Sequence, residues 1–87
     1  MAVIEVESSN GEFRVTVDGA SEHVVDVPQG YVDGLGLAGV DRARLVRASF
    51  EFLLEREPKE SIMRRFELSV IERYFPEYRS EIVRRLR

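Results

Sequence analysis

Arginine is the residue type in this 87-residue chain whose number and placement could support chemistry with a partner. Twelve of the thirteen basic residues are Arg, and Lys59 is the exception. Residues 1–40 carry one basic and seven acidic residues, a net charge of −6, whereas residues 41–87 carry twelve basic and nine acidic residues, a net charge of +3. Because Arg forms planar, bidentate pairs with carboxylate and phosphate, the second half presents either an anion-binding surface or an ordinary solvated one.

Nucleic acid is one partner that such a surface would suit. Residues 58–75 resemble a helix-turn-helix, with a first helix over 58–66, a turn at Leu68-Ser69, and a second helix whose start has the spacing of a capping box, Ser69 to Glu72. The turn lacks Gly, however, Pro76 shortens the second helix, and the net charge of the whole chain is −3. Nucleic-acid binding is therefore the alternative function, and its candidate residues are Arg64, Arg65, Arg73, Arg79, Arg84 and Arg85.

Catalytic and cofactor chemistry has little support in the sequence. There is no Cys, and the single imidazole, His23, stands among valines, where a histidine is typically exposed or half-buried on a strand. The glycines at 34, 36 and 39 have the count of a dinucleotide-binding loop, but no second parallel strand follows them, so we interpret them as turn residues. We predict that the protein is not an enzyme and has no catalytic residues, metal or cofactor.

The first third of the chain predicts three antiparallel strands. Asn10-Gly11 is the signature of a two-residue hairpin turn, because both positions of that turn require positive φ. The register that follows puts Val6 opposite Val15 and Glu7 opposite Arg14, and it separates the apolar from the charged side chains. A third strand is expected from about Glu22 to Val27. Such a meander has one apolar face and needs a cover.

The rest of the chain predicts helices. Asp41 is a good N-cap for a helix that reaches about Glu57, just before Pro58. Its apolar arc is so wide that it must make contacts on two sides, with the sheet and the later helices or with a second subunit on the Phe50 and Leu54 side. Shorter helices are expected over 58–66, 69–75 and 77–87. We therefore predict an α+β fold in which a three-stranded antiparallel meander packs on a central helix with two or three short C-terminal helices behind it.

The domain organisation that we predict is one domain over 1–87. It comprises a β meander (1–28), a Gly-containing connector (29–40) and a helical part (41–87). Tyr31, Val32, Leu35 and Leu37 in the connector are expected to close the edge of the core.

The preferred functional interpretation is a small non-catalytic interaction or accessory module. It would act through a protein partner or by self-association, with Phe50, Leu54, Tyr74 and Tyr78 as the partner-binding residues. The sequence contains no apolar run long enough to span a membrane, and its acidic N-terminus differs from a secretory signal. We therefore expect a cytoplasmic protein without a membrane partner.

Two stretches, 45–58 and 68–78, resemble segments of a family of small bacterial proteins of unknown function. The resemblance implies a cytoplasmic bacterial protein. It implies no activity, cofactor or site residue.

Overall fold

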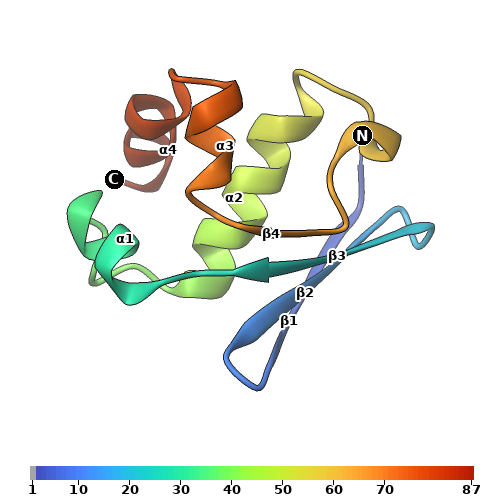
Figure 1. Ribbon diagram of the computed structural model, residues 1–87, viewed down its shortest axis with the longest axis horizontal. Coiled ribbons are helices and arrows are strands. Elements are labelled where there is room, and N and C mark those ends of the chain that lie inside the picture. The colour runs from blue at the N-terminus through green and yellow to red at the C-terminus, as the bar shows by residue number, and fades with distance from the viewer. Residues whose placement is uncertain (1) are drawn as a thin grey trace.

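The computed structural model describes residues 2–87 and has an α+β architecture built on one four-stranded sheet (Figure 1). The strands lie in the order β1-β2-β3-β4, and the helices gather on one side of the sheet. The elements in chain order are β1 (Ile4–Ser9), β2 (Glu12–Val17), β3 (Ser21–Asp26), α1 (Gln29–Gly34), α2 (Arg42–Leu54), the 3₁₀ turn η1 (Lys59–Ser61), β4 (Arg65–Glu67), α3 (Val70–Tyr74) and α4 (Tyr78–Leu86).

The predicted hairpin between β1 and β2 is confirmed residue by residue. Val6 pairs with Val15 and Glu7 with Arg14. Asn10 and Gly11, which form the turn, have φ angles of 51° and 82°. Positive φ at both positions gives the turn a twist that matches the two strands, so these two residues fix the register of the whole hairpin.

The register of β3, which the sequence left open, is set by its antiparallel pairing with β2. Val25 lies opposite Phe13 and His23 opposite Val15, and all four side chains are buried. The intervening Val24 lies opposite Arg14, on the face of the sheet that the helices do not cover. The meander therefore has one apolar face, as its alternation requires.

α2 lies at the centre of the core and makes aromatic contacts on two sides. On the sheet side, the Phe50 ring lies 5.3 Å from the His23 ring and 6.1 Å from the Phe66 ring. On the side of the C-terminal helices, the Phe52 ring lies 5.2 Å from the Tyr78 ring in an edge-on arrangement. At its N-terminus, Asp41 accepts a hydrogen bond from the Arg44 backbone N–H at 3.3 Å, as the N-cap prediction requires.

The predicted three-stranded antiparallel meander is present as β1-β2-β3, but the sheet has a fourth strand, and the helix predicted over 58–66 is wrong. In place of that helix, the chain forms η1 and then β4, which pairs in parallel with β3. The Val24 N–H donates to the Arg64 carbonyl at 2.7 Å, and the Leu68 N–H donates to the Asp26 carbonyl at 2.9 Å. The physical reason is that β3 has a free edge, and the 64–68 segment satisfies its backbone groups while burying Phe66.

Three smaller expectations also differ from the structure. The connector contains a short helix, α1, rather than turns alone. The central helix ends at Leu54, three residues before Glu57. Glu57 itself precedes Pro58, and helical geometry is disfavoured at that position. The Ser69 side chain does not cap α3 but donates to the Glu67 carboxylate at 2.7 Å.

A buried hydrogen bond joins α2 to α4. The Ser49 hydroxyl donates to the Leu45 carbonyl at 2.8 Å, so the Tyr78 hydroxyl, 2.7 Å away, must be the donor to Ser49 Oγ. Both side chains are buried. Removal from water raises the pKa of Tyr78 well above its ordinary value, which keeps the phenol protonated and able to donate.

Tyr78→Phe is expected to lower the free energy of unfolding by about 1 kcal/mol, because it removes one buried hydrogen bond and leaves the ring in place. The measurement is equilibrium unfolding in urea. Tyr74→Phe is the matched control, since Tyr74 is exposed, and its effect should stay within about 0.5 kcal/mol. Equal effects of the two substitutions would contradict this role for the Tyr78 hydroxyl.

Candidate interaction site

One of the depressions among the described residues is an apolar groove. It lies between the C-terminal end of α2, the segment around η1, β4 and α3, and its volume is about 360 Å³. Its floor is apolar and is made by Leu53, Ile62, Phe66, Val70, Ile71 and Phe75.

The rim of this groove carries exposed apolar side chains. Met63 is 43% exposed and Tyr74 is 68% exposed, although both are large hydrophobic residues. Glu57 and Ser61 are the polar residues that line the groove. The lining is otherwise apolar, so the groove is suited to receiving apolar side chains.

The buried side chain of His23 forms a hydrogen bond to the backbone of the rim residue Met63. Its ring is 2% exposed, and Nδ1 lies 2.8 Å from the Met63 carbonyl oxygen. Because a carbonyl only accepts, Nδ1 carries the proton, and in the neutral ring Nε2 accepts from the Ser21 hydroxyl at 2.9 Å. The expectation that His23 is exposed or half-buried is therefore wrong. It is a buried link between β3 and the rim residue Met63.

The four residues expected to bind a partner lie in different environments. Tyr74 is on the rim of the groove, and Leu54 is half-buried near the end of α2. Phe50 and Tyr78 are fully buried, so neither is available to a partner in the folded chain. The sequence interpretation missed Met63, because it placed that residue in a helix. The alternation of apolar and charged residues over Phe66, Glu67 and Leu68 is the sequence signal for a strand here, but it does not single out Met63.

Most of the arginines expected to contact phosphate are held by carboxylates. Arg65 pairs with Glu12 at 2.7 Å, and Arg79 lies 3.6 Å from Glu72 and donates to the Gly34 carbonyl. Arg84 and Arg85 both pair with Glu81. Arg64 and Arg73 are exposed and take part in no ion pair within residues 2–87. The six side chains therefore do not form one free cationic surface.

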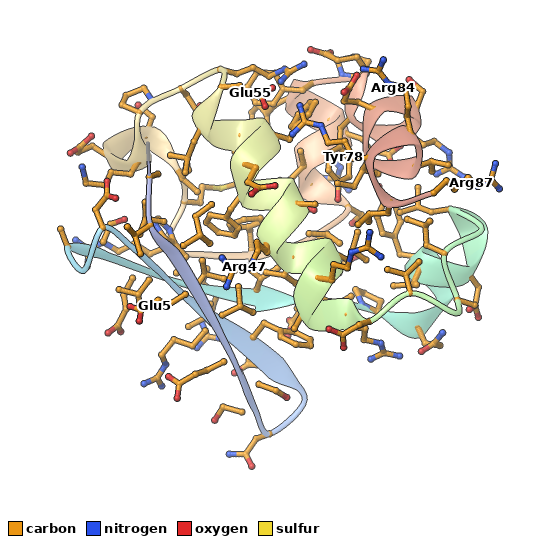
Figure 2. All side chains as sticks on the ribbon, turned by 180° about the vertical axis from the view of Figure 1, so that it is seen from behind. Glu5, Arg47, Glu55, Tyr78, Arg84 and Arg87 are labelled. Carbon is orange, nitrogen blue, oxygen red and sulfur yellow. The ribbon has the colours of Figure 1, made fainter. Side chains whose placement is uncertain are left out.

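A charged network joins the end of α2 to α4 (Figure 2). Arg85 lies 2.6 Å from the Glu55 carboxylate, and this hydrogen bond holds the pKa of Glu55 below its ordinary range. Hydrogen bonds from Arg84 and then Arg85 lower the pKa of Glu81 in the same way. The Arg56 guanidinium lies 3.6 Å from the centre of the Phe52 ring. At the end of α2 and along α4, these arginines are therefore paired with carboxylates of the same chain.

No group of three or more His, Asp or Glu side chains within residues 2–87 is placed to hold a metal ion. In the same part of the chain, every helix is too short or too polar to span a membrane. A scan against protein-family models, a search of curated proteins and a search of solved structures each found no match.

The Glu55–Arg85–Glu81 network is expected to make stability depend on pH. A carboxylate whose pKa is lower in the folded state stabilises the fold above its unfolded pKa, about 4.3 for Glu, and this contribution is lost as the pH falls through the folded value. The unfolding temperature of the wild type should therefore fall as the pH is lowered below about 4. Arg85→Met should show a smaller fall. Identical pH profiles would contradict the network's role.

Proposed function

We propose that this protein is a small cytoplasmic, non-catalytic interaction module that binds a segment of a partner protein in the apolar groove. The observation that carries the proposal is the pair of exposed side chains, Met63 and Tyr74, at the rim of a groove with an apolar floor. Exposed apolar side chains that border a depression are typical of sites where another chain binds. Apolar residues of a partner that bind there would remove water from the groove and from their own surface, which favours binding.

The composition of the groove favours a protein segment over a small metabolite. A volume of about 360 Å³ is near the lower end of small-molecule pockets, about 300–1,000 Å³, but such pockets normally have several polar groups that fix the orientation of the ligand. Here Glu57 and Ser61 provide few such groups. A peptide supplies its own backbone groups and several apolar side chains, so it matches a mainly apolar lining better.

Nucleic-acid binding is the alternative that the test must separate from this proposal. Arg64 and Arg73 lie next to the rim residues Met63 and Tyr74 in the chain. They are the two of the six candidate arginines that have no ion pair in the described part of the molecule. Phosphate contacts would make binding fall steeply with salt, whereas an apolar contact would be insensitive to salt.

A negative charge placed at the groove rim is expected to weaken the binding of selected peptides. Peptides selected from a random displayed library on the wild-type protein should bind Met63→Glu and Tyr74→Glu about tenfold more weakly or worse, because each variant puts a carboxylate beside apolar side chains. The measurement is the dissociation constant by calorimetry, with chemical-shift mapping of the bound site. Ala38→Glu is the matched control, since it adds the same charge at an exposed position outside the groove.

Three results would count against this function. The first is a library that yields no peptide, and the second is a set of peptides that bind all four proteins equally. The third is retention of duplex DNA or RNA that is lost with added salt and with Arg64→Ala and Arg73→Ala, which would support the nucleic-acid alternative. Self-association that Met63→Glu abolishes would identify a second copy as the occupant of the groove.

A further inference from the structure

We propose that the partner at the groove is a second copy of this chain, joined by antiparallel pairing of the two β4 edges around a two-fold axis at Phe66. This inference rests on the proposed function of the groove and names its partner. A two-fold interface uses the same surface on both copies, so that surface must complement itself. The β4 edge does so in its backbone groups, in its charges and in the apolar surface beside it.

The outer edge of β4 has backbone groups in position to pair with another strand. β4 is the last strand in the sheet order (Figure 1), and the Val24 N–H of β3 donates to the Arg64 carbonyl. Because successive residues of a strand direct their backbone groups to opposite edges, the N–H and C=O groups of Arg65 and Glu67 point away from β3. In an antiparallel pair, Arg65 of each copy can therefore exchange both backbone hydrogen bonds with Glu67 of the other.

The charges on this edge select one register for the pairing. Charged side chains on an edge strand usually prevent contact with another chain, because like charges meet. Pairing centred on Arg65 or on Glu67 would indeed set each of these residues against its own copy. Pairing centred on Phe66, the residue between them, instead places Arg65 opposite Glu67 of the second copy, and the two-fold axis repeats the contact.

The same complementarity extends across the open face of the sheet. A basic row that contains Arg14 and Arg65 runs beside an acidic row of Glu12, Asp26 and Glu67. Asp26 and Glu67 are exposed and take part in no ion pair within residues 2–87. The proposed register brings the acidic row of each copy into line with the basic row of the other, which supplies the cations that these two carboxylates lack.

This pairing also keeps the helices of both copies on one side of the joined sheet. Residues that lie opposite each other in an antiparallel pair project to the same face. The exposed side chains of Arg65 and Glu67 therefore share the open face with those of the second copy, and the two helical layers share the other face. Phe66, in the groove floor, faces Phe66 of the second copy across the axis.

The exposed rim of the groove is covered in this arrangement. When the register is continued beyond β4, Met63 of one copy lies opposite Ser69 of the other, the residue just before α3. Met63 and Tyr74, which are 43% and 68% exposed, both line the groove on the helical side. Their removal from water favours association. The second copy thus provides the apolar segment that the proposed function of the groove requires.

The other free edge of the sheet, β1, does not complement itself. Glu5 and Glu7 are exposed on either side of Val6. Two β1 strands paired around Val6 would place Glu5 against Glu7 twice, and pairing centred on either glutamate would set it against its own copy. β4 is therefore the edge that a second copy fits.

The test measures the mass of the full chain in solution by sedimentation equilibrium from about 1 µM to about 1 mM, and we expect it to rise from one chain to two. Arg65→Glu and Glu67→Arg each place like charges together at two contacts, so each should raise the dissociation constant about tenfold or more. Arg47→Glu is the matched control, since Arg47 is exposed on α2, and it should change the constant less than about twofold.

Two combinations of these substitutions should restore the dimer. An equimolar mixture of the Arg65→Glu and Glu67→Arg chains sets opposite charges at both contacts, and so does one chain that carries both substitutions. Each combination should dimerise within about threefold of the wild type. Arg65→Glu also removes the pairing with Glu12 inside the chain, so circular dichroism is used to check its fold. Glu67→Arg keeps the inference falsifiable if Arg65→Glu does not fold.

The outcomes separate this inference from the proposed function. Loss of the dimer in each single variant with recovery in both combinations supports pairing of the β4 edges. A chain that stays single at about 1 mM overturns it, while library-selected peptides that bind the groove would still support the proposed function. A dimer that Met63→Glu abolishes but that neither charge variant weakens overturns the β4 pairing and leaves the groove as the contact.

Discussion

The burial of α2 from two sides is the constraint on which the rest of this structure depends. Its apolar residues cover too wide an arc for one neighbouring layer to hide. The sheet covers one part of that arc through Phe50, and the C-terminal helices cover another through Ser49 and Phe52. Only a charged stripe that includes Arg47 and Glu51 remains in solvent. In a chain of 87 residues, both covering layers must therefore be made from short elements.

The groove is a consequence of where this central helix ends. α2 stops at Leu54, and Pro58 redirects the chain toward the sheet, where it becomes η1 and β4. The chain then returns through α3 toward the other side of α2. The two covering layers thus separate at the end of the helix, and the space between them is lined at one end by Leu53, in the last apolar turn. The same two-sided burial that stabilises the core leaves an apolar depression at its end.

The sequence predicted the elements that depend on local signals. Asn10-Gly11 specified the first hairpin, and Asp41 specified the start of α2, because a turn or a cap involves only neighbouring residues. It did not predict β4, since that strand forms only because β3, about forty residues earlier, has an edge to be paired. Ile62 and Phe66 are four residues apart and fit a helical face as well as a strand, so periodicity alone favoured the wrong element.

The candidate site also depends on contacts between distant parts of the chain, which the sequence pattern does not show. Tyr74 was expected to contact a partner because it belongs to an aromatic cluster around Pro76, and the structure places it on the groove rim. Phe50 and Tyr78 were also expected to contact a partner, but periodicity identifies an apolar face without saying what covers it. Here the face is covered within the chain itself. Met63 depends on β4 and on its backbone bond to His23, so only the folded arrangement identifies it.

The parallel pairing of β4 has a further consequence for how the groove is maintained. No hairpin ties β4 to β3, and three residue pairs hold the two strands together. The separation in sequence makes this pairing costly in chain entropy and leaves it with few local contacts. Segments of this kind open more readily than the rest of a fold. The groove therefore depends on the pairing of β4 with β3, and a ligand that binds only the paired form would stabilise that pairing.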